Sequence, residues 1–456
     1  MQSRLSWILI LFPFVITFGQ QSRTALFPDT PVGRRVEAYV KAFNHGDTAM
    51  REFFLKYSSE DALQKVPMDQ RIDRYRQMHE RLGALELRKV NESDKDHLSA
   101  LFQSGSGNLV NIDFEFEKSA PFGLLGLRIE DAGHDAEMVP ADHKKNNADL
   151  IHAAERYASD LSGKDEFSGV ILIAQHGKPF FEHSYGYADR DKKVPNTIDT
   201  KFDIGSINKS FTALAIHKLA AEGKLSLSDP IKKFLPEYPN KDAAQDVTVQ
   251  ELLDMTSGIG DFFGDRYEAT PKEHLRTLRA YLPLFADKPL EFKPGTNHRY
   301  SNGGYVVLGL IIEEVTGTDY YSYVRKNIFL PAGMSQTDSY EKDSLPAGCA
   351  VGYTSRGGSL RSNYPTLPER GSSAGGGYST VRDLLSYTIA LEKGTITTSD
   401  DKERGGFGIA GGAPGLNAAL EWNPNSGYVI VVMSNFDPPA AEKVARQLRA
   451  WLPETE

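Results

Sequence analysis

Segments that favour β-strands lie at both ends of the region from about residue 149 to 456, and segments that favour helices fill its middle. Apolar residues run through 169–175 and 179–185 near the start, and through 418–422 and 428–433 near the end. A last stretch, 440–452, places Val444, Leu448 and Trp451 on one helical face. This layout predicts an α/β domain in which a sheet flanked by helices carries an inserted helical subdomain.

The order of helix-favouring and strand-favouring segments also predicts a separate unit at residues 28–132. Helix-spaced apolar residues occur in 36–43 and 72–82, and strand-like runs follow at 85–87, 98–102, 110–117 and 124–129. The run 110–117 alternates apolar and polar residues, which is typical of a strand with one buried face. We therefore predict a small α+β domain, with a loose resemblance to nuclear-transport-factor-2-type folds. It shows no catalytic constellation, and the polar stretch 133–148 is a predicted linker.

The first twenty residues have the layout of a secretory signal peptide. Arg4 precedes an apolar run from Leu5 to Phe18, and the sequence turns polar at Gln20. The alternative is an uncleaved anchor, but the run is shorter than the ~20 residues that a spanning helix needs. We expect residues 1–20 to be removed, which leaves no membrane span and a secreted or periplasmic protein.

Composition and charge exclude several classes of partner. Net charge is −9 without a Lys/Arg block, which argues against nucleic acid or an anionic membrane surface as a partner. Cys349 is the only cysteine, so no intrachain disulfide can form. Histidines lack metal spacing and the glycine-rich stretches lack a phosphate-binding motif, so no metal or cofactor is expected. The sequence leaves the oligomeric state open.

A Ser-x-x-Lys motif occurs three times, at Ser206, Ser339 and Ser399. The second and third copies lie in polar, loop-like stretches. Only Ser206 stands where an apolar segment leads into a helix, which places Lys209 one turn later on the same face.

This spacing has a chemical use, because a serine hydroxyl is a poor nucleophile until a neighbour takes its proton. Lys209 is within reach, and it becomes a base if burial or nearby positive charge lowers its pKa. The Ser206 N–H at the helix start can stabilise a developing oxyanion. The alternative reading is an N-capping serine followed by a solvated lysine.

Tyr300-Ser301-Asn302 is a second motif of interest, because it lies in a loop followed by a predicted helix from Gly304 to Thr316. Tyr238-Pro239-Asn240 has the same pattern, but it stands in a proline-rich turn and is predicted to be structural.

Together these motifs resemble the family of class C β-lactamases, penicillin-binding proteins and related serine esterases. The resemblance covers roughly residues 150–452, with supporting stretches at 167–170, 252–258, 292–295 and 375–380. It implies a β-lactamase-like fold whose antiparallel sheet is flanked by helices. It also implies that Ser206 is acylated, that Lys209 and Tyr300 share proton transfer, and that Tyr300 activates the deacylating water. Asn302 would orient the lysine or a substrate amide.

The third family motif is where this chain departs. Relatives carry Lys-Thr-Gly or His-x-Gly beside the nucleophile, whereas the matching segment here is Ile409-Ala410-Gly411-Gly412. The glycines allow close backbone approach, and the Gly412 N–H is the expected second oxyanion donor. Ile409 cannot hold a carboxylate. We therefore expect β-lactams and D-alanyl peptides to be poor substrates, and esters or uncharged acyl compounds to fit better.

Two functions stay open at this point. The first is a secreted serine hydrolase that acts on esters or on amide or peptide-like acyl compounds through an acyl-enzyme on Ser206. The second is a weak or inactive relative that binds cell-wall peptide or another ligand, which Ile409 motivates. The Gly-x-Ser-x-Gly segment at Ser373 lacks the preceding apolar strand of a nucleophile elbow, and a lone His298 is more often structural.

Overall fold

The computed structural model describes residues 27–59, 62–63, 68–105, 108–117, 123–134, 146–355, 359–397 and 406–453. The chain divides into two compact units, Met1–Val139 and Pro140–Glu456. The predicted signal peptide lies outside the described residues, and so does the predicted linker between 135 and 145. Regular structure extends into both ends of the predicted linker 133–148, because one strand continues to His134 and a helix begins at Asn147.

The N-terminal unit places helices before an antiparallel sheet, in the order that the sequence pattern predicts. Thr30 caps the first helix by accepting a hydrogen bond from the Gly33 N–H. The alternation in the third strand buries Val110, Ile112 and Phe114 against the helices. Its resemblance to nuclear-transport-factor-2-type folds stays a prediction. The elements are α1 (Pro31–His45), α2 (Asp47–Tyr57), α4 (Met68–Leu82), β1 (Leu85–Ser93), β2 (His97–Ser104), β3 (Asn108–Phe116) and β4 (Leu124–His134), with sheet order β1-β2-β3-β4.

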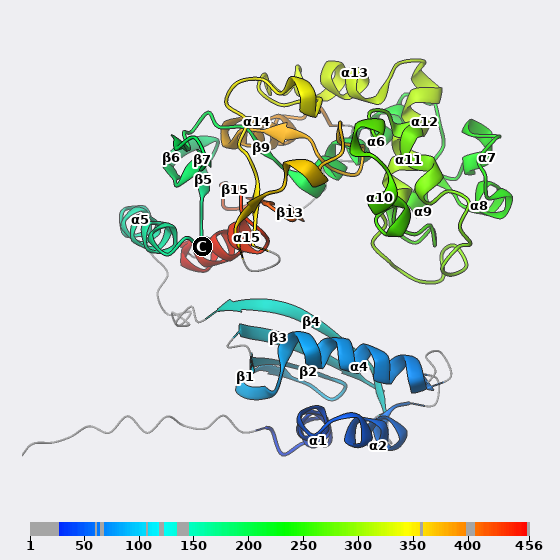
Figure 1. Ribbon diagram of the computed structural model, residues 1–456, viewed down its shortest axis with the longest axis vertical. Helices are drawn as coiled ribbons and strands as arrows, with labels where there is room; N and C mark the ends of the chain where they lie inside the picture. The colour runs from blue at the N-terminus through cyan, green and yellow to red at the C-terminus, as the bar shows by residue number, and fades with distance from the viewer. Residues whose placement is uncertain are drawn as a thin grey trace, which may run out of the picture. The chain divides into compact units, whose positions relative to one another are not determined.

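A five-stranded antiparallel sheet forms the centre of the C-terminal unit, and it joins strands from both ends of that unit (Figure 1). Its order is β13-β14-β15-β5-β6, so the last strand of the chain lies beside the first strand of the unit. Every residue of the β15 sequence YVIVVMS is buried, as expected of a strand covered on both faces. The strands are β5 (Gly169–Gln175), β6 (Lys178–Tyr185), β13 (Phe407–Ala413), β14 (Leu416–Asn423) and β15 (Tyr428–Ser434).

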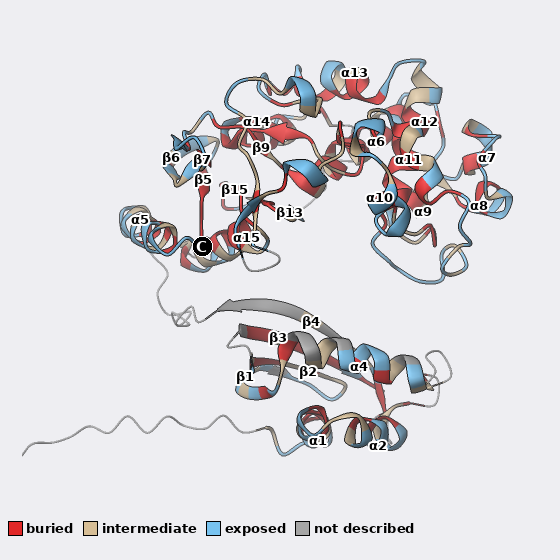
Figure 2. Cartoon of the chain, viewed as in Figure 1, coloured by how far each residue is buried: buried red, intermediate tan, exposed pale blue. Residues whose placement is uncertain are grey.

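Helices cover both faces of this sheet. α5 (Asn147–Gly163) and α15 (Ala440–Trp451) pack together on one face, and α14 (Val381–Glu392) packs on the other (Figure 1). Val170 and Leu172 of β5 join the side chains of α6 and α14 in one core cluster. Buried residues accordingly line the sheet and the inner sides of the helices (Figure 2). The predicted α/β, β-lactamase-like fold class is confirmed.

The inserted part lies between α6 and α14 and is mainly helical. Its longest helix, α12, is buried along most of its length and packs against α6, α9 and α13. The helices of this part, preceded by α6 (Asn208–Ala221), are α7 (Ile231–Phe234), α8 (Lys241–Asp246), α9 (Val249–Leu253), α10 (Asp265–Ala269), α11 (Leu278–Tyr281), α12 (Asn302–Thr316) and α13 (Tyr320–Val324). Short helical turns are η1 (Gly205–Ile207), η2 (Lys272–His274), η3 (Leu282–Leu284), η4 (Arg325–Phe329), η5 (Lys342–Ser344) and η6 (Tyr364–Thr366). Short strands are β7 (Tyr187–Asp189), β8 (Val194–Pro195), β9 (Phe202–Asp203), β10 (Tyr353–Thr354), β11 (Arg361–Ser362) and β12 (Tyr378–Ser379).

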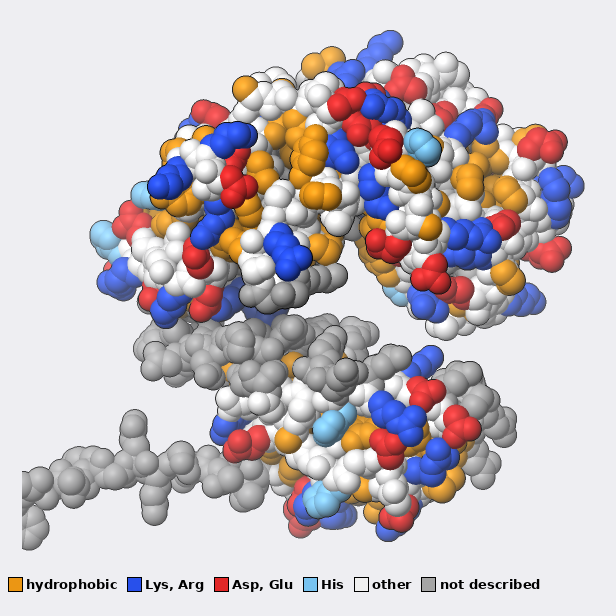
Figure 3. Space-filling view, viewed as in Figure 1, with side chains coloured by type: hydrophobic (Ala, Val, Ile, Leu, Met, Phe, Trp, Pro, Cys, Tyr) orange, Lys and Arg blue, Asp and Glu red, His pale blue; other side chains and the backbone are white. Residues whose placement is uncertain are grey.

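The described surface is mixed in charge. On the face in Figure 3, acidic and basic side chains are interspersed over the C-terminal unit. None of the helices within the described residues combines the length and the apolar character needed to cross a bilayer.

Candidate active site

Ser206 lies in η1, the single turn that joins β9 to α6. The Asp203 carboxylate accepts the Gly205 N–H at 2.8 Å, and Gly205 has a left-handed φ of 49°. Burial raises the pKa of Asp203 to about 6. A side chain at position 205 would also meet the Gly412 nitrogen at 2.9 Å. The turn before Ser206 therefore requires glycine both for its φ and for the approach of β13.

Lys209 is buried at the start of α6 and directs its amine back toward Ser206. Its Nζ lies 3.2 Å from Ser206 Oγ, 2.6 Å from Asn302 Oδ1 and 2.6 Å from the Ala374 carbonyl oxygen. Burial lowers the pKa of Lys209 to about 7, and the nearby Asp261 carboxylate opposes that shift. A lysine with that pKa is partly neutral near pH 7, as a proton acceptor must be.

Tyr300 is the second side chain that contacts the Ser206 hydroxyl. Its hydroxyl lies 2.5 Å from Ser206 Oγ, and the Lys209 amine lies 4.6 Å from its ring centroid. Tyr300 as a whole residue is 48% exposed, so it also forms part of the site's open surface. Burial of its hydroxyl end raises the pKa of Tyr300, and the bond to Ser206 opposes that shift.

The start of α12 fixes the Tyr300 motif. Ser301 is the N-cap, and its hydroxyl accepts the Gly304 N–H at 2.8 Å. Asn302 is the first helical residue, and its Nδ2 donates to the Asp261 carboxylate at 2.7 Å. Its amide is held at one end by a carboxylate, so its oxygen stays turned toward Lys209.

The backbone of β13 approaches Ser206 from the sheet. Within the described strands β13 forms one edge, and a Cβ at Gly411 would lie 2.0 Å from the Ile204 oxygen and 2.6 Å from the Ser206 nitrogen. No side chain fits there, so glycine at 411 permits the approach. Ile409, two residues earlier on the same strand, is partly buried and packs against the main core cluster.

The β-lactamase family matches residues 154–452, about two-thirds of this sequence. The chain belongs to the β-lactamase family. Penicillin-binding protein 4* of Bacillus subtilis is 34% identical over 188 residues, which are 41% of each chain, so the match spans under half of that relative. The penicillin-binding protein structure from Bacillus halodurans is similar, with 31% identity, a TM-score of 0.59, and coverage of 67% of this chain and 99% of that one. A D-amino acid amidase from Ochrobactrum anthropi has 25% identity and a TM-score of 0.58, over 66% of this chain and 98% of that one.

These findings confirm the predicted family and fold. The structure brings Ser206, Lys209, Tyr300 and Asn302 together, and places Gly411 and Gly412 beside the turn that carries Ser206.

Two groups of this β-lactamase-family site were not predicted from the sequence. The Ala374 carbonyl is a main-chain acceptor for Lys209, and Asp261 holds Asn302. Asp261 closely follows the stretch 252–258, which carries part of the family resemblance, but no spacing rule marks it. A carbonyl can come from any residue type, so Ala374 carries no side-chain signal at all.

The alternatives considered for this β-lactamase-family chain lie apart from the nucleophile. Ser373 of the Gly-x-Ser-x-Gly segment is fully buried and donates to the Tyr305 carbonyl. Asn240 of the second Tyr-x-Asn pattern caps α8. His298 is exposed, and no contact recorded among the described residues joins its ring to Ser206 or Lys209. Lys342 of the second Ser-x-x-Lys match donates to the Leu367 carbonyl, and the third match lies outside the described residues.

Proposed function

We propose that this protein hydrolyses esters or uncharged amide-like acyl compounds through an acyl-enzyme on Ser206. The observation that carries the proposal is the position of Ser206 Oγ, between Lys209 Nζ at 3.2 Å and the Tyr300 hydroxyl at 2.5 Å. Few structural roles need a serine hydroxyl held between a buried amine and a phenol.

Lys209 acts as the base in this proposal. Because burial lowers its pKa to about 7, roughly half of the molecules carry a neutral amine at pH 7. A neutral amine has two protons and one lone pair. Asn302 Oδ1 and the Ala374 oxygen, both at 2.6 Å, accept the two protons, and the remaining direction points to Ser206 Oγ.

Tyr300 serves as a proton relay. Its pKa is raised by burial, so its hydroxyl stays protonated at neutral pH. When Ser206 Oγ attacks the acyl carbon, its proton passes to the Lys209 amine. Tyr300 then delivers a proton to the leaving oxygen or nitrogen and takes its replacement from the Lys209 ammonium. In the second half-reaction the attacking water gives a proton to Tyr300 as Tyr300 passes its own proton to the neutral Lys209 amine. The resulting Lys209 ammonium then protonates Ser206 Oγ, which leaves as the hydroxyl.

The backbone beside Ser206 supplies the oxyanion site. The Ser206 and Gly412 N–H groups are the proposed donors, and the approach of β13 to η1 supports this pairing. One such donor contributes about 2.7–4 kcal/mol to transition-state stabilisation.

The side chains of β13 support an uncharged substrate class. Ile409 stands at the position where relatives carry Lys or His, and its partly buried apolar side chain offers no positive charge there. The similarity to a D-amino acid amidase supports including amides. We also propose export, on the pattern of residues 1–20, and sequencing the N-terminus of the mature protein tests it.

The second candidate is a weak or inactive relative that binds cell-wall peptide or another ligand. Ile409 favours it, because an altered third motif can accompany loss of catalysis. The lowered pKa of Lys209 argues against it, since a pure binding protein gains nothing from a buried, partly neutral lysine.

A fluorophosphonate probe separates the two candidates. Folded wild-type protein is expected to be labelled on Ser206, and Ser206→Ala is expected to lose all labelling and all hydrolysis of short-chain p-nitrophenyl esters. Ser339→Ala, in the second Ser-x-x-Lys match, is the control and should react like the wild type. Failure of the folded wild type to react would falsify the hydrolase proposal. Turnover of nitrocefin at the rate of a true β-lactamase would instead overturn the substrate class.

A further inference from the structure

Five successive carbonyl groups, from Arg370 to Ala374, each accept a hydrogen bond from a side chain. The segment, called the carbonyl strip below, belongs to no helix, and its last three residues form most of a tight turn, Ser372–Gly375. Its residues from 371 to 374 are buried. The donors, in chain order of the carbonyls, are Tyr281 Oη at 2.8 Å, Tyr321 Oη at 2.7 Å, Asn208 Nδ2 at 3.0 Å, Thr212 Oγ1 at 2.7 Å and Lys209 Nζ at 2.6 Å.

Buried backbone outside regular structure needs such partners, but one donor for every carbonyl in a row fixes the strip at each residue. The last donor is Lys209 itself. The strip therefore ends at the group that contacts the amine, and its other four carbonyls determine where that end lies.

The donors are connected among themselves. Thr212 has one hydroxyl proton and gives it to the Ser373 carbonyl, so its oxygen accepts from Tyr320, 2.7 Å away. The Tyr320 hydroxyl then accepts from Asn208 Nδ2 at 3.3 Å. All three groups are buried, so the proton directions along this chain permit a single arrangement.

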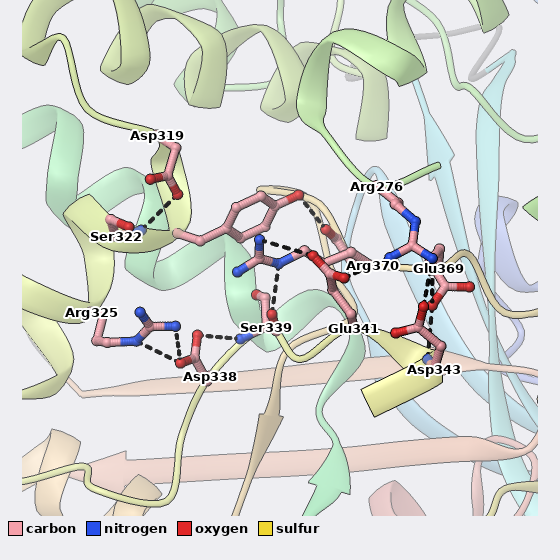
Figure 4. Close-up of polar contacts among 12 residues, drawn as sticks. Arg276, Asp319, Ser322, Arg325, Asp338, Ser339, Glu341, Asp343, Glu369 and Arg370 are labelled. Carbon is pink, nitrogen blue, oxygen red and sulfur yellow. Dashed lines mark hydrogen bonds and ion pairs between the residues drawn. The ribbon is translucent and has the colours of Figure 1, made fainter. Parts of the chain in front are cut away.

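The outer end of the strip is held by charge. The Arg370 guanidinium lies 3.6 Å from the Tyr321 ring centroid and donates from Nε to the Ser339 carbonyl at 2.8 Å. Glu341 lies beside it and also binds Arg276, as Figure 4 shows. Arg276 in turn pairs with Asp343 and approaches the buried Glu369 at 3.7 Å.

We propose that the carbonyl strip, held by Thr212, Tyr321 and Tyr281, is a positioning element that aims the Lys209 amine at Ser206. The inference rests on the proposed role of Lys209 as base. The lone pair of the neutral amine faces Ser206 only while Asn302 and the Ala374 carbonyl take its two protons. A shift of the Ala374 oxygen turns the lone pair away, although no substrate contact is lost.

Two conservative variants test the strip, each with a matched control. Thr212→Val and Tyr321→Phe each delete one hydroxyl that holds the strip. Thr388→Val deletes a buried hydroxyl that donates to the Leu385 carbonyl at 2.8 Å, and Tyr267→Phe deletes one that donates to the Thr366 carbonyl at 3.3 Å, outside the strip. The measurements are kcat and KM for a p-nitrophenyl ester from pH 5 to 10, together with the thermal unfolding temperature.

Thr212→Val is expected to lower kcat about tenfold with little change in KM, because sub-ångström misplacement of a reacting group costs rate and not binding. Tyr321→Phe acts two residues farther out along the strip, at Gly371, and is expected to lower kcat less. The acid limb of the kcat profile should move to lower pH in both, since an ammonium with a weakened acceptor is easier to deprotonate. The two controls are expected to lower the unfolding temperature about as much as the two test variants do. They should leave the acid limb of the kcat profile at its wild-type pH.

If the acid limb of the kcat profile lies at the same pH in all four variants and only their stability differs, the positioning role is overturned. Loss of kcat in the controls as large as in the test variants would overturn it as well. Fluorophosphonate labelling of Ser206 in the wild type is measured alongside. If the wild type is not labelled, the proposed function has failed. If it is labelled while Thr212→Val keeps the wild-type pH profile, only the strip has failed.

Discussion

On one side of Ser206, two of four hydrogen-bonded side chains contact its hydroxyl and the other two support Lys209. On the other side, the backbone of β13 approaches, and the nearest large side chain of that strand is apolar. The first side holds Lys209, Tyr300, Asn302 and Asp261, all joined by hydrogen bonds of 2.5–3.2 Å. The second offers Gly411 and Gly412 at close range, while Ile409 is partly buried and packs against the core cluster. The groups for the proposed proton transfer are thus all present on the first side, whereas the side chains of β13 on the second side carry no charge.

The contrast teaches that the two halves of such a site can change independently. Proton transfer depends on groups that contact Ser206 directly, so any loss there is expected to abolish turnover. In the proposed function, the side chain at 409 acts only on the substrate. We therefore expect a substitution at 409 to change which substrate is accepted without changing proton transfer.

Removing the proposed base, Lys209, from the polar side is expected to cause the largest loss of activity. Lys209→Met should lower kcat for ester hydrolysis by about 10³-fold or more, because Ser206 loses its proton acceptor. Lys218→Met, in a partly exposed position of the same helix, is the control. Activity of Lys209→Met near that of the control would rule out Lys209 as the base.

The same variant has a pH-dependent effect on stability. A native lysine with a lowered pKa binds fewer protons than the unfolded chain between pH 7 and 10.5, so wild-type stability rises with pH in that window. Lys209→Met has no lysine at this position and lacks this pH-dependent gain in stability. Its unfolding temperature relative to the wild type should therefore be highest at or below pH 7 and fall toward pH 10, which thermal unfolding in matched buffers measures.

On the backbone side, the largest expected effect comes from adding one methyl group. In Gly411→Ala the new Cβ would lie 2.6 Å from the Ser206 nitrogen, so β13 or η1 must shift and disturb the proposed oxyanion donors. We expect kcat to fall about 10²-fold. Gly408→Ala is the matched control on the same strand, because its Cβ meets only Glu421 Cγ at 3.8 Å. Equal rates for the two variants would contradict a close approach of β13 in catalysis.

Sequence patterns predicted the half of this comparison that depends on local spacing. Ser206 and Lys209 lie one turn apart, and an i, i+3 relation on a helix survives any tertiary arrangement. The strands at both ends of the domain were predictable because buried strands read as continuous apolar runs. Helix α2 was missed although Met50, Phe53, Phe54 and Tyr57 have helical spacing, so there the signal was present and unused.

Other parts of the site have no local signal. Lys209 meets the Ala374 carbonyl across 165 residues and Asn302 across 93. Main-chain carbonyls are supplied by every residue type, so the strip from 370 to 374 cannot be distinguished from any loop by its sequence. Tyr300 and Asn302 were assigned through family resemblance, and Asp261 was not found, because a carboxylate in a loop is usually solvated.

A substitution at position 409 can add the positive charge that β13 lacks. Ile409→Lys should raise the rate of a carboxylate-bearing substrate such as nitrocefin about tenfold relative to a neutral ester, which corresponds to one charge-assisted hydrogen bond. Ile409→Met keeps an apolar side chain and is the control. The ratio of kcat/KM for the two substrates is the measurement. A ratio that changes equally in both variants would mean that size and not charge at 409 sets selectivity.

Asp261→Asn tests the polar side of the site and is expected to have the smallest effect on kcat. The amide can still accept from Asn302 Nδ2 through its oxygen, so the difference between a charged and a neutral acceptor is expected to cost less than about tenfold in kcat. The Asp261 charge raises the pKa of Lys209 against the larger effect of burial, and removing it lowers that pKa further. Lys209 is active when neutral, so the acid limb of the kcat profile should move to lower pH. Asp254→Asn is the control, since its carboxylate also accepts from an amide, that of Gln250 at 2.7 Å, but at the surface. An acid limb that moves to higher pH in Asp261→Asn, or that moves equally in both variants, would show that Asp261 does not act on the charge of Lys209.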